Sequence, residues 1–303
     1  MSLCNAFRLL AILGLLLATA GCRSTDPGTS PDSGNSQTLL EEKLLEVIAE
    51  ERRLDEAAAL PDADEREIQR GFHRLAREYQ GIIARNPDHL ESHLLYGKLL
   101  SRYGDREGAR EQFLIAARID PDIAVIHQQL STYYAEESDY TRALAYALNA
   151  IEIEPETAAY HFGLGQLLVA FRDEYIDEGV FSRSQIETQM LEAFETAASL
   201  EPDTLPLQFR HGEAFYDLSS PDWEGALSHW ESLQSHPLLT DLQADVVRVH
   251  RVRCLRELGR TAEAEEVIAS IQRPSLREEG KRLLDGHSGD GPEEADAPAS
   301  SDS

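Results

Sequence analysis

Residues 87–121 read PDHLESHLLYGKLLSRYGDREGAREQFLIAARIDP, and residues 121–155 read PDIAVIHQQLSTYYAEESDYTRALAYALNAIEIEP. The boundary pairs Asn86-Pro87, Asp120-Pro121 and Glu154-Pro155 follow one another at steps of 34 and 34 residues. A constant step of this size is typical of stacked helix–turn–helix units. Proline suits such a boundary because it ends one helix and can begin the next, where its missing N–H leaves no hydrogen bond unmade.

Other positions recur in the same phase. Small residues stand where the two helices of a unit are expected to cross, at Gly97, Ser131 and Gly165. Further prolines follow at Pro202 and Pro237, after steps of 47 and 35 residues. The positions together resemble the tetratricopeptide repeat (TPR), W-x2-L-G-x2-Y, then A-x3-F, then Pro. Histidine stands in place of the tryptophan in three units, at His93, His127 and His161.

The resemblance implies an all-α fold, a TPR superhelical solenoid of antiparallel helix pairs with about 5–6 repeats and disordered termini. The solenoid is expected over residues 88–273, with thirteen extra residues (47 minus 34) in the third repeat, at 172–184. Residues 39–87 contain two apolar-periodic stretches and are interpreted as N-terminal helices or a divergent repeat. Residues 274–284 are expected to form a capping helix, because end repeats need a polar outer face.

The N-terminus contains a short apolar run, Leu9–Ala20, that ends in Thr19-Ala20-Gly21-Cys22. Twelve residues are too few to span a bilayer, where about 20 are needed, but they suit a signal peptide. The pattern resembles a bacterial lipoprotein signal over 1–21, with Cys22 lipidated and residues 22–38 a flexible tether. The resemblance implies a membrane lipoprotein on the periplasmic side, at the outer membrane rather than the inner one. An ordinary cleaved secretion signal is the alternative.

The charge balance limits the class of partner. The chain has 55 acidic and 28 basic residues, which give a formal net charge of −27. Nucleic-acid binding requires a basic surface, so the balance argues against such a partner. Residues 285–303 contain six acids and neither Lys nor Arg, so a disordered acidic tail is expected there.

The sequence carries no nucleotide-binding, nucleophile-elbow or paired-cysteine motif. The three in-phase histidines are expected to pack as tryptophan replacements. A metal ladder is the alternative, but first helices about 10 Å apart cannot share a zinc ion with bonds of about 2.1 Å. Cys254 is interpreted as a small buried residue, with a reactive thiol as the alternative. We therefore expect no catalytic residue, no metal and no cofactor, and a chain that is not an enzyme.

The TPR resemblance implies that the first helices line a concave groove for partner proteins. The groove residues expected from their phase in each repeat are Leu94, Lys98, Val125, Gln128, Phe162, Gln166, Phe209, Glu213 and Tyr216. Packing between repeats is the alternative for Phe162 and Phe209. The insertion at 172–184 is expected to be a contact loop with Tyr175, Ile176 and Phe181, or else a tolerated extension.

Anchor, tether and solenoid in this order suggest a membrane-anchored scaffold that binds envelope proteins of a bacterium. Two other functions are kept open by the sequence. One is a metal-dependent envelope enzyme that uses histidine and acid sites. The other is a soluble regulatory TPR protein.

Overall fold

The computed structural model describes the backbone of residues 31–286 and the side chains from Thr38 onward. This part of the chain contains fourteen α-helices and no strand, so the predicted all-α fold is confirmed. The helices are α2 (Pro31–Ala58), α3 (Glu65–Arg85), α4 (Leu90–Arg102), α5 (Arg106–Ile119), α6 (Ala124–Glu136), α7 (Tyr140–Ile153), α8 (Ala158–Ala170), α9 (Arg172–Asp177), α10 (Arg183–Leu200), α11 (Leu205–Ala214), α12 (Trp223–Leu233), α13 (Asp241–Glu257), α14 (Thr261–Ser270) and α15 (Pro274–Leu284).

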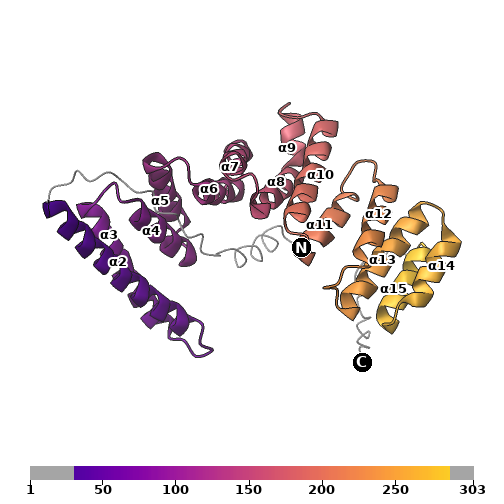
Figure 1. The fold of residues 1–303 in the computed structure, drawn as a ribbon, viewed down its shortest axis with the longest axis horizontal. Coiled ribbons are helices and arrows are strands. Elements are labelled where there is room, and N and C mark those ends of the chain that lie inside the picture. The colour runs from indigo at the N-terminus through magenta and orange to yellow at the C-terminus, as the bar shows by residue number, and fades with distance from the viewer. Residues whose placement is uncertain (1–30, 287–303) are drawn as a thin grey trace, which may run out of the picture. The chain divides into compact units, whose positions relative to one another are not determined.

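The chain divides into two compact units, one up to Gly163 and one from Leu164 onward. We call their described parts the N-terminal unit (31–163) and the C-terminal unit (164–286). Consecutive helices pack as antiparallel pairs, with α2 against α3, α4 against α5 and α6 against α7 in the N-terminal unit. In the C-terminal unit, α13 packs against α12, α14 and α15 (Figure 1).

The turns inside successive pairs share one geometry. Gly104 and Ser138 are 34 residues apart, and both have positive φ, at 86° and 61°. The following residues, Asp105 and Asp139, donate their backbone N–H to carbonyls five residues earlier, as in a Schellman turn. Their side chains then accept the N–H of the third residue of the next helix, at 3.0 and 3.1 Å. One short sequence pattern therefore ends the first helix and begins the second.

A small residue on the first helix of a pair faces a large ring on the second. A Cβ added at Gly97 would lie 3.2 Å from the Phe113 ring, and one added at Gly165 would lie 2.7 Å from the Phe194 ring. The same relation joins Gly212 to Trp230. The prediction that small residues allow the helices to cross closely is therefore confirmed, and the rings that fill the space are buried.

Two segments differ from the sequence-based expectation. Helix α2 begins at Pro31, inside the range predicted as a flexible tether, so residues 31–38 are helical instead. The predicted contact loop contains helix α9, and Tyr175 on that helix is fully buried. The Tyr175 ring meets Phe181 edge-on at 5.9 Å between centroids. Two aromatic residues of the insertion therefore pack together, and Tyr175 is a packing residue, not a surface contact.

Candidate functional site

The first helices of the N-terminal unit, α4, α6 and the part of α8 up to Gly163, carry a row of partly exposed side chains. Leu94, Gln128 and Phe162 follow one another at steps of 34 residues, so they hold the same place on consecutive first helices. Val125 is also half-buried on α6. A Cβ added at Gly163 would lie 2.8 Å from Nε2 of Gln128, which shows that the Gln128 side chain lies across the next first helix. We call Leu94, Val125, Gln128 and Phe162 the first-helix row.

Lys98 lies beside an ion-pair cluster that joins α4 to α2. Arg102 binds Glu51 at 2.7 Å and Asp55 at 2.5 Å. Tyr79 donates its hydroxyl to the other oxygen of Glu51, at 2.9 Å. Burial lowers the pKa of Lys98, and the positive charge of Arg102 lowers it further, while Glu51 acts in the opposite direction. The positive and negative side chains of this cluster already pair with one another. Lys98 is therefore a weak candidate for binding a carboxylate of a partner.

The three in-phase histidines form one repeated hydrogen bond. Nε2 of His93, His127 and His161 lies 2.9, 2.7 and 2.7 Å from the carbonyl oxygen six residues earlier. That carbonyl belongs each time to the boundary proline, at Pro87, Pro121 and Pro155. Because a carbonyl only accepts, Nε2 must carry the proton. His93 and His127 are also buried, which confirms the predicted packing role for these two side chains.

In the C-terminal unit, two of the expected groove residues pack into the protein itself. The Phe209 ring meets the Trp230 ring edge-on, with centroids 5.5 Å apart. The Tyr216 hydroxyl accepts a hydrogen bond from Nε1 of Trp230 at 2.6 Å. Both side chains belong to the surroundings of the unit's hydrophobic core. The structure favours the packing interpretation for Phe209, and Tyr216 likewise packs against the core.

The two polar groove candidates of this unit are half-buried. Glu213 lies beside the ion pair of Arg210 and Asp217, whose atoms are 2.6 Å apart. Burial raises the pKa of Glu213, while Arg210 acts in the opposite direction. Gln166 on α8 is likewise half-buried. Of the insertion residues, Ile176 and Phe181 are half-buried rather than fully exposed.

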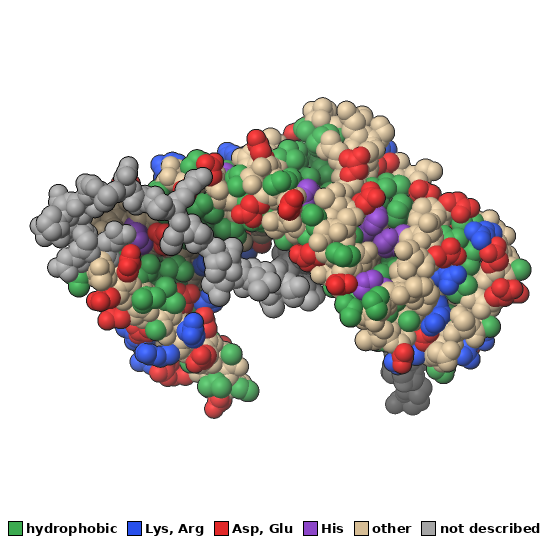
Figure 2. All heavy atoms as spheres, viewed as in Figure 1, with side chains coloured by type: hydrophobic (Ala, Val, Ile, Leu, Met, Phe, Trp, Pro, Cys, Tyr) green, Lys and Arg blue, Asp and Glu red, His purple; other side chains and the backbone are tan. Residues whose placement is uncertain are grey.

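Three histidines gather around the same core and were not singled out by the sequence. Figure 2 shows histidine side chains together on the surface of the C-terminal unit. His211 and His229 lie with ring centroids 4.6 Å apart, and His250 stacks on Trp230 at 4.2 Å and 13°. Burial lowers the pKa of His211 and of His250 to about 4. Burial also lowers the pKa of His229, which donates Nε2–H to the Gln208 carbonyl at 2.8 Å.

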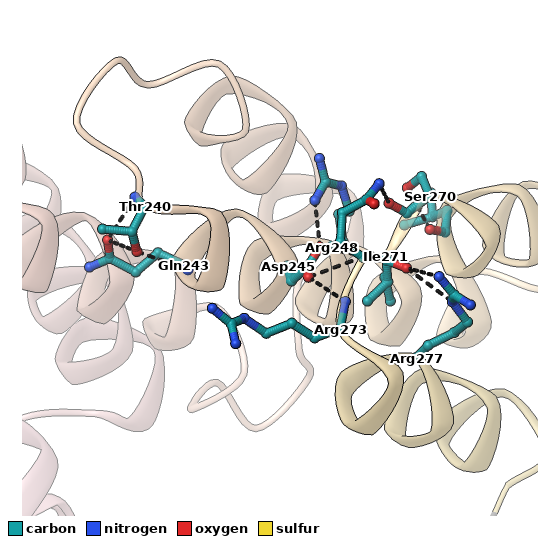
Figure 3. A network of polar contacts seen from close by, with 10 residues as sticks. Thr240, Gln243, Asp245, Arg248, Ser270, Ile271, Arg273 and Arg277 are labelled. Atoms are coloured by element: carbon teal, nitrogen blue, oxygen red, sulfur yellow. Dashed lines mark hydrogen bonds and ion pairs between the residues drawn. The ribbon is translucent and has the colours of Figure 1, made fainter.

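A buried carboxylate joins α13 to the start of α15. Asp245 is fully buried and accepts the backbone N–H groups of Gln272 and Arg273, at 3.0 and 2.9 Å, and the guanidinium of Arg248 at 2.6 Å (Figure 3). Burial alone would raise the pKa of this carboxyl, but these donors together hold it below its ordinary value. Asp245 is therefore a structural anion that fixes the capping helix.

The alternatives that involve metal or thiol chemistry gain no support within residues 31–286. No group of three or more His, Cys, Asp or Glu side chains in this range is placed to hold a metal ion. Cys254 is buried, and burial raises the pKa of its thiol. A raised pKa reduces the thiolate fraction, so the interpretation of Cys254 as a buried packing residue is confirmed.

Cys22, the predicted lipidation site, lies outside the described residues. Within the described part of the chain, no helix combines the length and the apolar character needed to cross a bilayer.

Comparison with known proteins identifies the fold but not the function. No protein-family model matches the chain, and no curated protein matches it. Among solved structures, the chain is similar to YrrB, described as a TPR protein with an unusual peptide-binding site, with a TM-score of 0.51 and 16% identity over 68% of this chain and 99% of that one. TTC0263 of Thermus thermophilus, a thermophilic TPR protein, gives a TM-score of 0.39 and 17% identity over 64% and 98%. MamA of Desulfovibrio magneticus RS-1 gives 0.44 and 17% over 56% and 88%. The likeness to YrrB, together with the helix pairs and the repeated turns, shows that this chain has the fold of a TPR protein.

Proposed function

We propose that this chain is a scaffold that binds segments of partner proteins along the first-helix row of its N-terminal unit. The observation that carries the proposal is the 34-residue spacing of Leu94, Gln128 and Phe162, all partly exposed on consecutive first helices. Neighbouring packed helices lie about 10 Å apart, and an extended peptide advances about 3.3 Å per residue. The row therefore suits a partner segment that presents a side chain at about every third position.

The chemistry of the row favours a mainly apolar partner segment. Leu94, Val125 and Phe162 offer hydrophobic contact, while the amide oxygen of Gln128 is buried against the next first helix. Lys98 is the one nearby cation of this set, and its position beside Glu51 and Arg102 weakens it as an anchor for a carboxylate. The proposed mechanism is binding alone, with no chemical step.

Site-specific photocrosslinking in cells tests this function. A photoreactive phenylalanine analogue is placed singly at Leu94, Val125 or Phe162, and the crosslinked products are identified by mass spectrometry. The matched control is Leu148, an apolar side chain of α7 that is 47% exposed and lies on a second helix. We expect one shared partner from the row positions and not from Leu148. The same products from Leu148, or only products within the chain itself, would contradict the proposal.

We further propose that lipidation of Cys22 attaches the scaffold to a bacterial membrane, facing the periplasm. The support is the apolar run Leu9–Ala20 followed by small residues and Cys22. Two or three acyl chains give durable attachment where a single chain is marginal. Mass spectrometry of the mature N-terminus measures this directly. A modified Cys22 as the first residue is the expected result, and a retained Met1 contradicts export.

A further inference from the structure

Helix α3 carries a row of exposed basic side chains on the face opposite its buried one. The buried face contains Phe72, Leu75 and Tyr79. The basic residues follow one another at steps of four, three, one and three positions, so they share one side of the helix over about three turns. We call them the basic stripe: Arg66, Arg70, His73, Arg74 and Arg77, all exposed. The stripe lies on the second helix of its pair, so it is separate from the first-helix row.

Most of the basic stripe has no carboxylate partner among the described side chains. Within residues 38–286, Arg74 is the one stripe residue that binds a carboxylate, that of Glu50 on α2, at 2.7 Å. In the neighbouring pair, by contrast, Arg102, Arg106 and Arg110 each bind a carboxylate. The whole chain has 55 acidic and 28 basic residues, so acids are available in excess. A row of arginines that lacks them is a local exception to the charge of this protein.

Two arginines of the stripe are held in the same way. Nε of Arg70 donates to the Arg66 carbonyl, and Nε of Arg77 donates to the His73 carbonyl, both at 3.2 Å. These bonds use Nε alone, so the two terminal nitrogens of each guanidinium remain as donors for a carboxylate. Arg70 and Arg77 are seven residues apart, which is about 10 Å along the helix axis. An extended chain covers this distance in about three residues.

The hollow within the stripe is narrow and is bordered by acids. Its lining residues all belong to α3 and are Arg70, His73, Arg74, Ala76, Arg77 and Gln80. On the side of α2, Glu50 binds Arg74, and Glu78 of α3 binds Lys43 at 3.1 Å. A flat anionic membrane or a nucleic acid extends beyond the stripe and would meet these acids. A single peptide segment can lie along the stripe alone, and charges farther away than about 8 Å are largely screened at physiological salt.

We propose that the basic stripe binds an acidic segment of a partner protein, with Arg70 and Arg77 each binding one carboxylate through their two terminal nitrogens. Arginine suits this role because its planar fork matches both oxygens of a carboxylate. The segment presents acids about three residues apart in an extended conformation. This surface is a second one, in addition to the first-helix row, and its partner has the opposite chemistry to the apolar segment proposed for that row.

Peptide binding to the full chain tests the chemistry of the occupant. The probe is a fluorescein-labelled peptide of four Glu-Gly-Ser repeats, which places an acid at every third residue, and its control has glutamine in place of each glutamate. Fluorescence anisotropy measures binding in about 20 mM and about 300 mM NaCl. We expect the glutamate peptide to bind, more weakly at the higher salt, and the glutamine peptide not to bind. Equal binding of the two peptides, or no binding of the glutamate peptide at the lower salt, overturns the proposal.

Arg70→Gln combined with Arg77→Gln tests the position of the site. Glutamine keeps a long polar side chain on an exposed helix face, so the chain should remain folded, which circular dichroism checks. We expect affinity for the glutamate peptide to fall about 10-fold, as two exposed ion pairs imply. The matched control is Arg52→Gln combined with Arg53→Gln, two exposed arginines of α2 whose loss changes the net charge equally. An equal loss of affinity in this control overturns the site, because net charge alone would then explain it.

A charge-conserving variant tests the binding geometry. Arg70→Lys combined with Arg77→Lys keeps both charges but removes the planar fork. Affinity should fall, although by less than in the glutamine variant. Affinity equal to that of the unmodified chain overturns binding through the two terminal nitrogens.

Vesicles separate a peptide from a lipid surface as the occupant. The full chain and the Arg70→Gln, Arg77→Gln variant are each sedimented with vesicles of phosphatidylcholine and phosphatidylglycerol. We expect the same bound fraction for both proteins. A lower bound fraction for the variant assigns the stripe to anionic headgroups and overturns the proposal of a protein segment.

Discussion

The histidines of the two units have different structural roles, although they are the same residue type on helices of the same fold. In the N-terminal unit, His93, His127 and His161 keep one phase, and each donates to the carbonyl of a boundary proline. In the C-terminal unit, His211 and His250 lie among aromatic rings, where burial lowers their pKa to about 4. The first set is part of the repeat itself, and the second packs around the hydrophobic core of the C-terminal unit.

The difference teaches where sequence periodicity carries information. A repeated hydrogen bond needs its residue at the same place in each unit, so spacing reveals it. A cluster such as His211, His229 and His250 brings together side chains from α11, α12 and α13 at unequal separations of 18 and 21 residues. Nothing in the phase of the repeat marks such a group.

The strongest way to break the C-terminal cluster is Trp230→Ala. The Trp230 ring is fully buried, stacks on His250 and packs against Phe209. Its removal leaves a large cavity and should cost about 3–5 kcal/mol of unfolding free energy. Urea unfolding followed by tryptophan fluorescence measures the loss, because Trp223, the second of the chain's two tryptophans, lies in the same unit and remains as reporter.

Trp223→Ala is the control for that experiment. Trp223 is only partly buried and touches the cluster through Tyr216, with ring centroids 5.3 Å apart. It should cost less than Trp230→Ala, with Trp230 as the reporter. An equal loss from both variants would show that the cluster is not centred on Trp230.

Acid should weaken the C-terminal unit next. His211 and His250 have a folded pKa of about 4, below the ordinary 6.5, because burial penalises their charged form. Between these values the unfolded chain binds more protons than the folded one. Stability of the C-terminal unit should therefore be complete above pH 6.5 and fall as the pH is lowered toward 4. Urea midpoints from tryptophan fluorescence at pH 7.5 and pH 5 measure this loss.

His250→Phe tests the cause of that pH dependence. Phenylalanine keeps a ring against Trp230 but cannot titrate, so the midpoint should change less between the two pH values. The other groups that face this position are the Tyr216 hydroxyl, 3.4 Å from Nδ1 of His250, and the positive charge of Arg253, which also lowers the pKa of His250. An unchanged pH dependence in the variant would assign the effect to other groups.

The smallest expected effect comes from extending the N-terminal pattern into the C-terminal unit. Gln208 stands six residues after Pro202, as each in-phase histidine does after its proline, and its amide donates to the carbonyls of Pro202 and Ala198 at 3.3 and 2.8 Å. Gln208→His should change the unfolding free energy by less than about 0.5 kcal/mol, because the donor is kept. Gln208→Ala, which removes it, should cost about 1 kcal/mol. Equal losses would mean that the donor at this position is not what matters.

Much of the fold could be predicted because residues close together in the sequence determine it. Prolines at 34-residue steps place the helix ends, and small residues such as Gly97 and Gly165 place the crossings of paired helices. The turns follow a local pattern as well, since a glycine or a serine with positive φ precedes a capping aspartate at Gly104 and Ser138.

The candidate site was less predictable where the repeat departs from its own length. Helix α11 has 10 residues where α4 and α6 have 13, and it ends at Ala214. Tyr216 therefore lies in the following turn, and its hydroxyl returns to Trp230 instead of pointing from a first helix. Tyr175 was misplaced for a related reason, since the extra residues of the third repeat form helix α9 and bury its ring. Counting phase from a proline is reliable only while the helices keep their length.

The histidine–proline bond also has a consequence for the speed of folding. Each bond closes a loop of only six residues, and the paired helices of the N-terminal unit are neighbours in sequence. Interactions over such short separations require little loop-closure entropy before they begin to stabilise the chain. Folding of this unit can therefore start at any of its helix pairs and spread to the next, as in other repeat arrays. Its relaxation should fall in the microsecond-to-millisecond range typical of helical proteins with local contacts.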